Sequence, residues 1–206
     1  MTLKRDGLTL PDMRLAILCL LASSVLSAAS QAQNVPVFAI SRKTSTIKFS
    51  VKASVALEGT FDKWDAGLTF ASSDVTTGVL DIKVRADTVD TGSWIKDRKL
   101  KSEDFFDVER NPFITFLSKK IVQTGPDTFE VQGNFTIRGV TKPETLMLTV
   151  SGKGTGSGEI KGTMAFDRKD FGMDSGIPFI KIADRVEVNV ALKGKRVSGP
   201  PLVFQQ

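Results

Sequence analysis

The feature that most constrains this chain is the alternation of apolar and polar residues with a period of two. It recurs in five separate segments, around residues 47–51, 80–84, 129–137, 146–150 and 186–192. Successive side chains of a β-strand point to opposite faces, so each segment predicts a strand with one buried and one solvated face. We therefore expect an all-β protein.

Short turn signals separate these segments, including Gly125-Pro126, Arg138-Gly139 and the glycine-rich residues 152–162. Connections this short favour antiparallel hairpins, because parallel strands need a crossover of about a dozen residues or more. Closing a long antiparallel sheet on itself removes its exposed edges. The prediction is an eight-stranded antiparallel barrel, whose interior is either packed solid or holds one small ligand.

One segment interrupts the strands. Residues 88–107 show no alternation, carry Thr91 and Ser102 as helix N-cap candidates, and hold a charged run at residues 96–101. This pattern predicts a short helical insertion around residues 91–107. It also places Phe105 and Phe106 among many charged side chains.

The first 32 residues are typical of a secretory signal peptide. Lys4, Arg5 and Arg14 precede an apolar run at residues 15–26 and a stretch of small residues. The run is shorter than the roughly 18 to 20 residues that span a bilayer. We expect residues 1–32 to be cleaved, residues 33–196 to form a single barrel domain, and residues 197–206 to be a flexible tail.

Composition removes several functional classes. The chain has no histidine, and its one cysteine, Cys19, lies within the predicted signal peptide. The commonest general base, the commonest metal ligand and any cysteine nucleophile are thus missing from the mature chain. Removing the signal leaves 25 basic and 21 acidic residues, mixed along the chain. This balance argues against nucleic-acid binding, and we expect no catalytic residues, no metal and no cofactor.

Two motifs have ordinary explanations. The glycine-rich residues 152–158 match no phosphate-binding loop and lie between strands, which favours a hairpin. Asp97 or Asp104 would serve a carboxylate-dependent hydrolase, but both have basic neighbours such as Arg98 and Lys101, which favours ion pairing.

The fourteen phenylalanines, with no tyrosine, leave two readings open. These rings either fill the core or line a dry cavity with few polar groups.

Several ordered motifs resemble the YceI-like polyisoprenoid-binding family. The central group contains TVDTG at 88–92, then Asp97-Arg98, Leu100 and Ser102, DFFD at 104–107, Asn111-Pro112 and ITF at 114–116. A second group is GNFTIRGVTKP at 133–143. Agreement continues with EGTF at 58–61 and LTF at 68–70, with Asp167-Arg168 and DFGM at 170–173, and with DRV at 184–186.

The resemblance implies a lipocalin-like barrel that is exported to the periplasm and holds a long isoprenoid chain, such as a polyprenyl quinone or polyprenyl phosphate. It brings no catalytic residues. Family members often carry histidine in the first strands, where this chain has Lys43 to Phe49 and Lys52. If that histidine contacts the ligand's head group, head-group preference differs here.

With this resemblance we expect carriage or storage of an isoprenoid lipid or quinone, and transient contact with the membrane surface or a membrane electron-transfer protein. The alternative is a ligand-free interaction or stress-related module with a solid core. The side chains predicted to contact the ligand are Phe49, Trp64, Phe70, Ile82, Phe105, Phe106, Phe116, Phe135, Ile137, Leu148, Phe166 and Val188, with Trp64 and Phe105 near an opening. The candidates for a head-group contact are Arg98, Lys99, Arg138 and Lys142.

Overall fold

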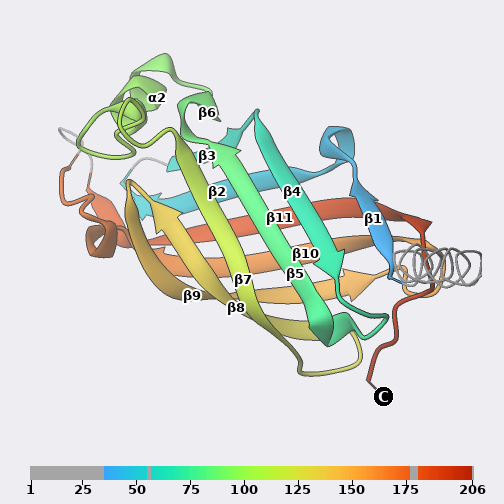
Figure 1. Cartoon of the computed structure of the whole chain (residues 1–206). Helices are drawn as coiled ribbons and strands as arrows, with labels where there is room; N and C mark the ends of the chain where they lie inside the picture. Colours follow the sequence, from blue (N-terminus) through green and yellow to red (C-terminus); the bar gives the residue numbers. More distant parts are fainter. Residues whose placement is uncertain (1–34, 55–56, 177–180, 206) are drawn as a thin grey trace, which may run out of the picture. The chain divides into compact units, whose positions relative to one another are not determined.

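The structure, a computed structural model, describes residues 35–54, 57–176 and 181–205. The predicted signal peptide lies outside the described residues. The described chain forms one antiparallel sheet that curls into a lipocalin-like barrel, with a single α-helix over one end (Figure 1).

Eleven strands make up this sheet. Their bounds are β1 Val37–Ile40, β2 Thr46–Ala53, β3 Leu57–Phe61, β4 Trp64–Phe70, β5 Gly78–Arg85, β6 Val89–Asp90, β7 Phe113–Gln123, β8 Thr128–Ile137, β9 Val140–Ser151, β10 Ser157–Asp167 and β11 Ile182–Ser198. The helix α2 spans Trp94–Lys101, and four 3-10 helices lie at Arg42–Thr44 (η1), Val75–Thr77 (η2), Ala86–Thr88 (η3) and Arg168–Phe171 (η4).

The strands pair in the order β4-β5-β7-β8-β9-β10-β11-β2-β3-β6, and β1 pairs with the end of β11. Between β1 and β4 the contact is made by side chains, with the rings of Phe38 and Phe70 5.9 Å apart. The all-β antiparallel prediction is confirmed, although the strand number differs. β1 and β6 are too short to show alternation, and Gly158 and Gly162 interrupt the apolar pattern of β10.

Alternation sets which side chains face inward. In β5 the inward positions Leu80, Ile82 and Val84 are all buried, and in β7 Ile114 and Phe116 are buried while Phe113 is on the outer face. Lys83 lies 3.9 Å from the centroid of the Phe113 ring, which covers part of this exposed aromatic surface. The core is therefore the barrel interior.

The glycine-rich segment is a hairpin, as predicted, but its loop is shorter than the composition suggests. Gly152, Gly154 and Gly156 have positive φ and form the turn. Gly158 and Gly162 already belong to β10, where Gly162 lies on the inner face against Leu148 and Leu146.

Residues 199–205 run back along the barrel. Val203 forms an isolated parallel bridge with Asp74, and the ring of Phe204 lies 6.1 Å from that of Phe129. In Figure 1 the C-terminal segment and α2 lie at opposite ends of the barrel.

Candidate functional site

The barrel interior contains an apolar cavity of about 100 Å³ at the end covered by α2. We call it the first cavity. Its lining is hydrophobic except for Lys48, Thr115 and Arg168. Such a surface selects a ligand by shape and dryness, because it offers few hydrogen-bonding groups.

The structure brings together nine of the twelve side chains predicted to contact a ligand. These nine line the first cavity: Phe49, Ile82, Phe105, Phe106, Phe116, Phe135, Ile137, Phe166 and Val188. Phe70 and Leu148 also face inward, but they lie further along their strands and line a second cavity. Trp64 is 5% exposed and lines neither cavity, so the structure places it in the core.

Two groups of phenylalanine rings shape this end of the barrel. One contains Phe49, Phe61 and Phe106, with centroids 5.7 to 6.4 Å apart, and the other contains Phe135, Phe166 and Phe171, with centroids 5.0 to 5.4 Å apart. These separations are in the range of favourable offset and edge-on contacts. Phe106 comes from the segment after α2, so this segment forms part of the cavity wall.

The start of α2 is fixed by a carboxylate inside the helix. Asp97 accepts hydrogen bonds from the backbone N–H of Thr91 at 2.8 Å and from its hydroxyl at 2.6 Å. The N-cap residue is Ser93, so the prediction of Thr91 as the N-cap is wrong. Ser102 is the C-cap and not an N-cap. Asp97 therefore has a structural contact at the start of α2.

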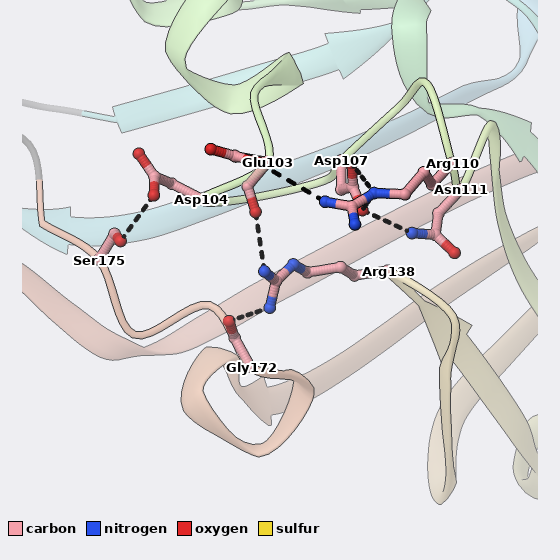
Figure 2. A network of polar contacts seen from close by, with 8 residues as sticks. All are labelled: Glu103, Asp104, Asp107, Arg110, Asn111, Arg138, Gly172 and Ser175. Atoms are coloured by element: carbon pink, nitrogen blue, oxygen red, sulfur yellow. Dashed lines mark hydrogen bonds and ion pairs between the residues drawn. The ribbon is translucent and has the colours of Figure 1, made fainter.

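Arg138 joins three segments of the chain, as Figure 2 shows. It lies in the β8–β9 turn with a positive φ of 53° and donates to the carbonyl oxygens of Glu103, at 2.8 Å, and Gly172. Glu103 follows α2, and Gly172 follows η4. One guanidinium thus holds the segments after α2 and after η4 together.

Asp104 provides a second link between the same segments. Its carboxylate accepts from the hydroxyl of Ser175 at 3.1 Å (Figure 2). It also pairs with Lys99 at 2.5 Å. The hydrogen bonds from Lys99 and Ser175 hold the pKa of Asp104 below its usual value. An ionised, paired carboxylate of this kind is suited to a structural contact and not to general acid catalysis.

The four head-group candidates differ in their surroundings. Arg138 and Lys99 have the contacts above, and Lys142 pairs with Asp170 at 3.1 Å. Arg98 is exposed and forms no ion pair with any described residue. It is the candidate that can take a new anionic partner without losing one.

The residue that sequence reasoning missed is Arg168. Its side chain is buried, lines the first cavity, and donates to the carbonyl oxygens of Met173, Ser175 and Ala183 and to the carboxylate of Asp184. Its position after Asp167 in a family motif was a usable signal. Composition gave none, because a buried arginine is rare.

The described residues contain neither a candidate metal-binding cluster nor a candidate membrane-spanning helix. The described residues hold no group of three or more side chains positioned to bind a metal ion. None of their helices is long and apolar enough to cross a bilayer.

The fold and the site together define a lipocalin-like barrel protein with an apolar interior. The model of the YceI-like domain matches residues 38–194, and the chain belongs to this family.

A relative agrees with this assignment, and solved structures share the fold. A UPF0312 protein of Pseudomonas aeruginosa is 31% identical over 147 residues, covering 68% of this chain and 74% of the relative. The crystal structure of Burkholderia cenocepacia BcnA matches with a TM-score of 0.68 and 24% identity, covering 75% of this chain and 99% of BcnA. A polyisoprenoid binding domain from Saccharophagus degradans, implicated in plant cell wall breakdown, matches with a TM-score of 0.61 and 13% identity, covering 78% and 99%.

Proposed function

We propose that this protein binds the chain of an isoprenoid lipid, a polyprenyl quinone or polyprenyl phosphate, in the first cavity and carries or stores it in the periplasm. The observation that carries the proposal is the apolar cavity beneath α2, whose lining offers almost no polar group. Family membership and the polyisoprenoid binding domain among its structural neighbours support it.

Energetics indicate what such a barrel exchanges with. Burial gains roughly 0.8 kcal/mol per methylene, so a chain of about 40 carbons gains tens of kcal/mol on leaving water and is rarely free. A bilayer and a phenylalanine-lined cavity are both dry. Transfer between them is therefore close to neutral, which suits a carrier or a reservoir.

The size of the first cavity shows what loading requires. An apolar cavity of about 150 Å³ holds one benzene-sized molecule, and the first cavity is about 100 Å³. A long chain needs more room, so part of the wall moves on loading. The segment bearing Phe105 and Phe106 lies outside the strands, and its links to the rest of the barrel include the contacts of Arg138 and Asp104 described above. This part of the wall can therefore move without breaking the pairing of the sheet.

A membrane contact fits the surface of α2. Trp94 and Ile95 are 70% and 63% exposed at its start, and lysine and arginine follow them in the helix. Tryptophan favours the membrane interface, and basic side chains favour anionic lipids. We place the bilayer surface against this end of the barrel, next to the first cavity.

Mass spectrometry of solvent extracts from the purified mature protein tests the proposal. We expect a prenyl lipid in an amount comparable to the protein, and a mature chain beginning at Gln33 in the periplasmic fraction. Extracts without any prenyl lipid under several growth conditions would refute the ligand assignment.

The second candidate is a ligand-free interaction module. The two groups of phenylalanine rings in mutual contact favour it, because the barrel's own side chains already occupy much of the interior. Lipid-free extracts together with unchanged stability on adding isoprenoids would favour this candidate.

A further inference from the structure

The barrel has a second apolar cavity, of about 130 Å³, at the end opposite to α2. None of its lining residues is shared with the first cavity. Its inner wall comes from hydrophobic residues of several strands, namely Phe38, Ile40, Leu68, Phe70, Phe129 and Leu148.

Side chains separate the two cavities. Leu80 and Val131 are inward-facing, fully buried and line neither cavity. Two glycines on the inner face are covered by neighbouring side chains. A Cβ on Gly133 would lie 2.8 Å from the ring of Phe116, and one on Gly162 would lie 2.7 Å from Leu148. The middle of the barrel, around Leu80, Val131, Gly133 and Gly162, is thus filled, and we call it the waist. The second cavity is therefore a separate space.

The chain's own C-terminal segment forms one side of the second cavity. Pro201, Leu202 and Phe204 belong to its lining, and Phe204 packs against Phe129 beneath it. Lys153 of the β9–β10 hairpin lies 4.9 Å from the centroid of the Phe204 ring. Residues 195–205 lie outside the part of the chain matched by the family model.

Few contacts hold that segment closed. Val203 exchanges hydrogen bonds with the backbone of Ser73, at 2.8 Å, and Val75, at 3.1 Å, and Gln205 exchanges two with the side chain of Gln123, at 2.7 and 2.8 Å. The conformational entropy that the chain end loses when it is fixed in place opposes these contacts. Opening breaks these four hydrogen bonds and the ring contacts of Phe204 but leaves the eleven-stranded sheet paired, so the segment can act as a lid.

One cation at the rim points to the kind of ligand. Arg196 lines the second cavity, is half-buried, and donates to the carbonyl oxygen of Gly199 but pairs with no carboxylate among the described residues. The other charges at this rim are paired, Lys153 with Asp127 and Glu159 with Lys161. An apolar space with one unpaired guanidinium at its edge matches a single hydrocarbon chain ending in a carboxylate.

We propose that the second cavity is a second ligand site, which takes the chain of a fatty-acid-type carboxylate, with Arg196 binding the head group and Phe204 acting as the lid. Because about 130 Å³ is less than the volume that holds one benzene-sized molecule, the C-terminal segment must open to admit the chain. The site is independent of isoprenoid binding in the first cavity.

Titration of ¹⁵N-labelled mature protein with decanoate, followed by NMR, tests the proposal. We expect saturable one-to-one shifts of amide signals from residues 150–158 and 192–205, with unchanged signals near Phe106 and Arg168. Decanol, which has the same chain but no charge, is expected to bind about tenfold more weakly, because it loses the charge-assisted contact. Shifts confined to the first-cavity end, or no shifts at all, would overturn the proposal.

Two variants sharpen the test. Arg196→Gln is expected to weaken decanoate binding about tenfold, whereas Lys195→Gln, which removes an exposed cation next to it, leaves binding unchanged. Phe204→Ala is expected to speed ligand exchange about tenfold or more, because it removes the lid side chain. Equal affinities for the two charge variants, or an unchanged exchange rate in Phe204→Ala, would contradict the assigned roles. Wild-type dispersion of the remaining signals verifies that each variant is folded.

Discussion

The replacement Arg168→Met tests the structural role of the buried guanidinium most sharply. Arg168 is 8% exposed at its side chain and donates to three backbone carbonyl oxygens, among them Ser175 at 2.9 Å and Ala183 at 3.3 Å. Methionine fills similar volume but leaves these acceptors without a donor. A buried acceptor without its charged partner is costly, and together the losses amount to about 3 to 5 kcal/mol.

The matched control is Lys169→Met. Lys169 contacts the same carboxylate, Asp184, at 2.8 Å, but its side chain is 50% exposed. Exposed ion pairs contribute little to stability, so the free energy of unfolding of this variant is expected to be close to that of the wild type. For a domain of this size the loss in Arg168→Met corresponds to a Tm lower by roughly 6 to 20 °C.

Urea denaturation and thermal unfolding of the two variants and the wild type measure this loss of stability. We expect Arg168→Met to have a clearly lower free energy of unfolding with an unchanged m-value. If Arg168→Met is no less stable than Lys169→Met, the argument from burial and carbonyl contacts is wrong.

Three further predictions concern the waist, the loop contact and the membrane-facing surface. Gly133→Ala should destabilise the barrel by about 1 to 3 kcal/mol in urea denaturation, because its Cβ would lie 2.6 Å from the backbone oxygen of Leu117. Gly67→Ala is the control and should be tolerated far better, because the space around Gly67 is open. Equal losses of unfolding free energy in the two variants would contradict the close approach at Gly133. Because the folded pKa of Asp104 lies below the ordinary value of 3.8, its contact with Ser175 stabilises the loop above that pH and is lost as the pH falls through the folded value. The protection of residues 171–176 against hydrogen exchange, relative to the intrinsic rate at each pH, should therefore fall below about pH 4 in the wild type but not in Asp104→Asn, and identical profiles would exclude this linkage. Trp94 fluorescence should shift to the blue on adding vesicles of phosphatidylethanolamine and phosphatidylglycerol. The double variant Trp94→Ser/Ile95→Ser should no longer sediment with these vesicles, whereas Leu117→Ser, a change at another exposed apolar residue, should still do so. Vesicle binding by the double variant would argue against this surface.

Much of the fold could be predicted from local pattern. The alternation around Ile82, Phe135 and Leu146 determines which side chains face inward, because a strand has no other way to bury one face. Seven of the nine predicted contacts that line the first cavity lie in strands and follow this alternation, whereas Phe105 and Phe106 lie outside the strands. The same reasoning could not separate Leu148 from Leu146, since parity gives the face but not the position along the barrel axis.

What could not be predicted depends on contacts between distant segments. Arg168 is buried because carbonyl groups from residues 173–183 converge on it, and no local pattern encodes that convergence. Residues 197–206 resemble a loose tail in composition, yet Phe204 lies against Phe129 and Gln205 against Gln123. These contacts join residues more than seventy positions apart in the chain.

Native mass spectrometry with an added polyprenyl quinone tests the central claim, that the first cavity holds the isoprenoid chain. The comparison uses Val188→Phe, which fills the cavity from within, and Glu187→Gln, which alters the exposed neighbour on the same strand. The account predicts a one-to-one complex for the wild type and Glu187→Gln, and its loss in a folded Val188→Phe. Equal quinone binding by all three proteins would show that the ligand lies elsewhere.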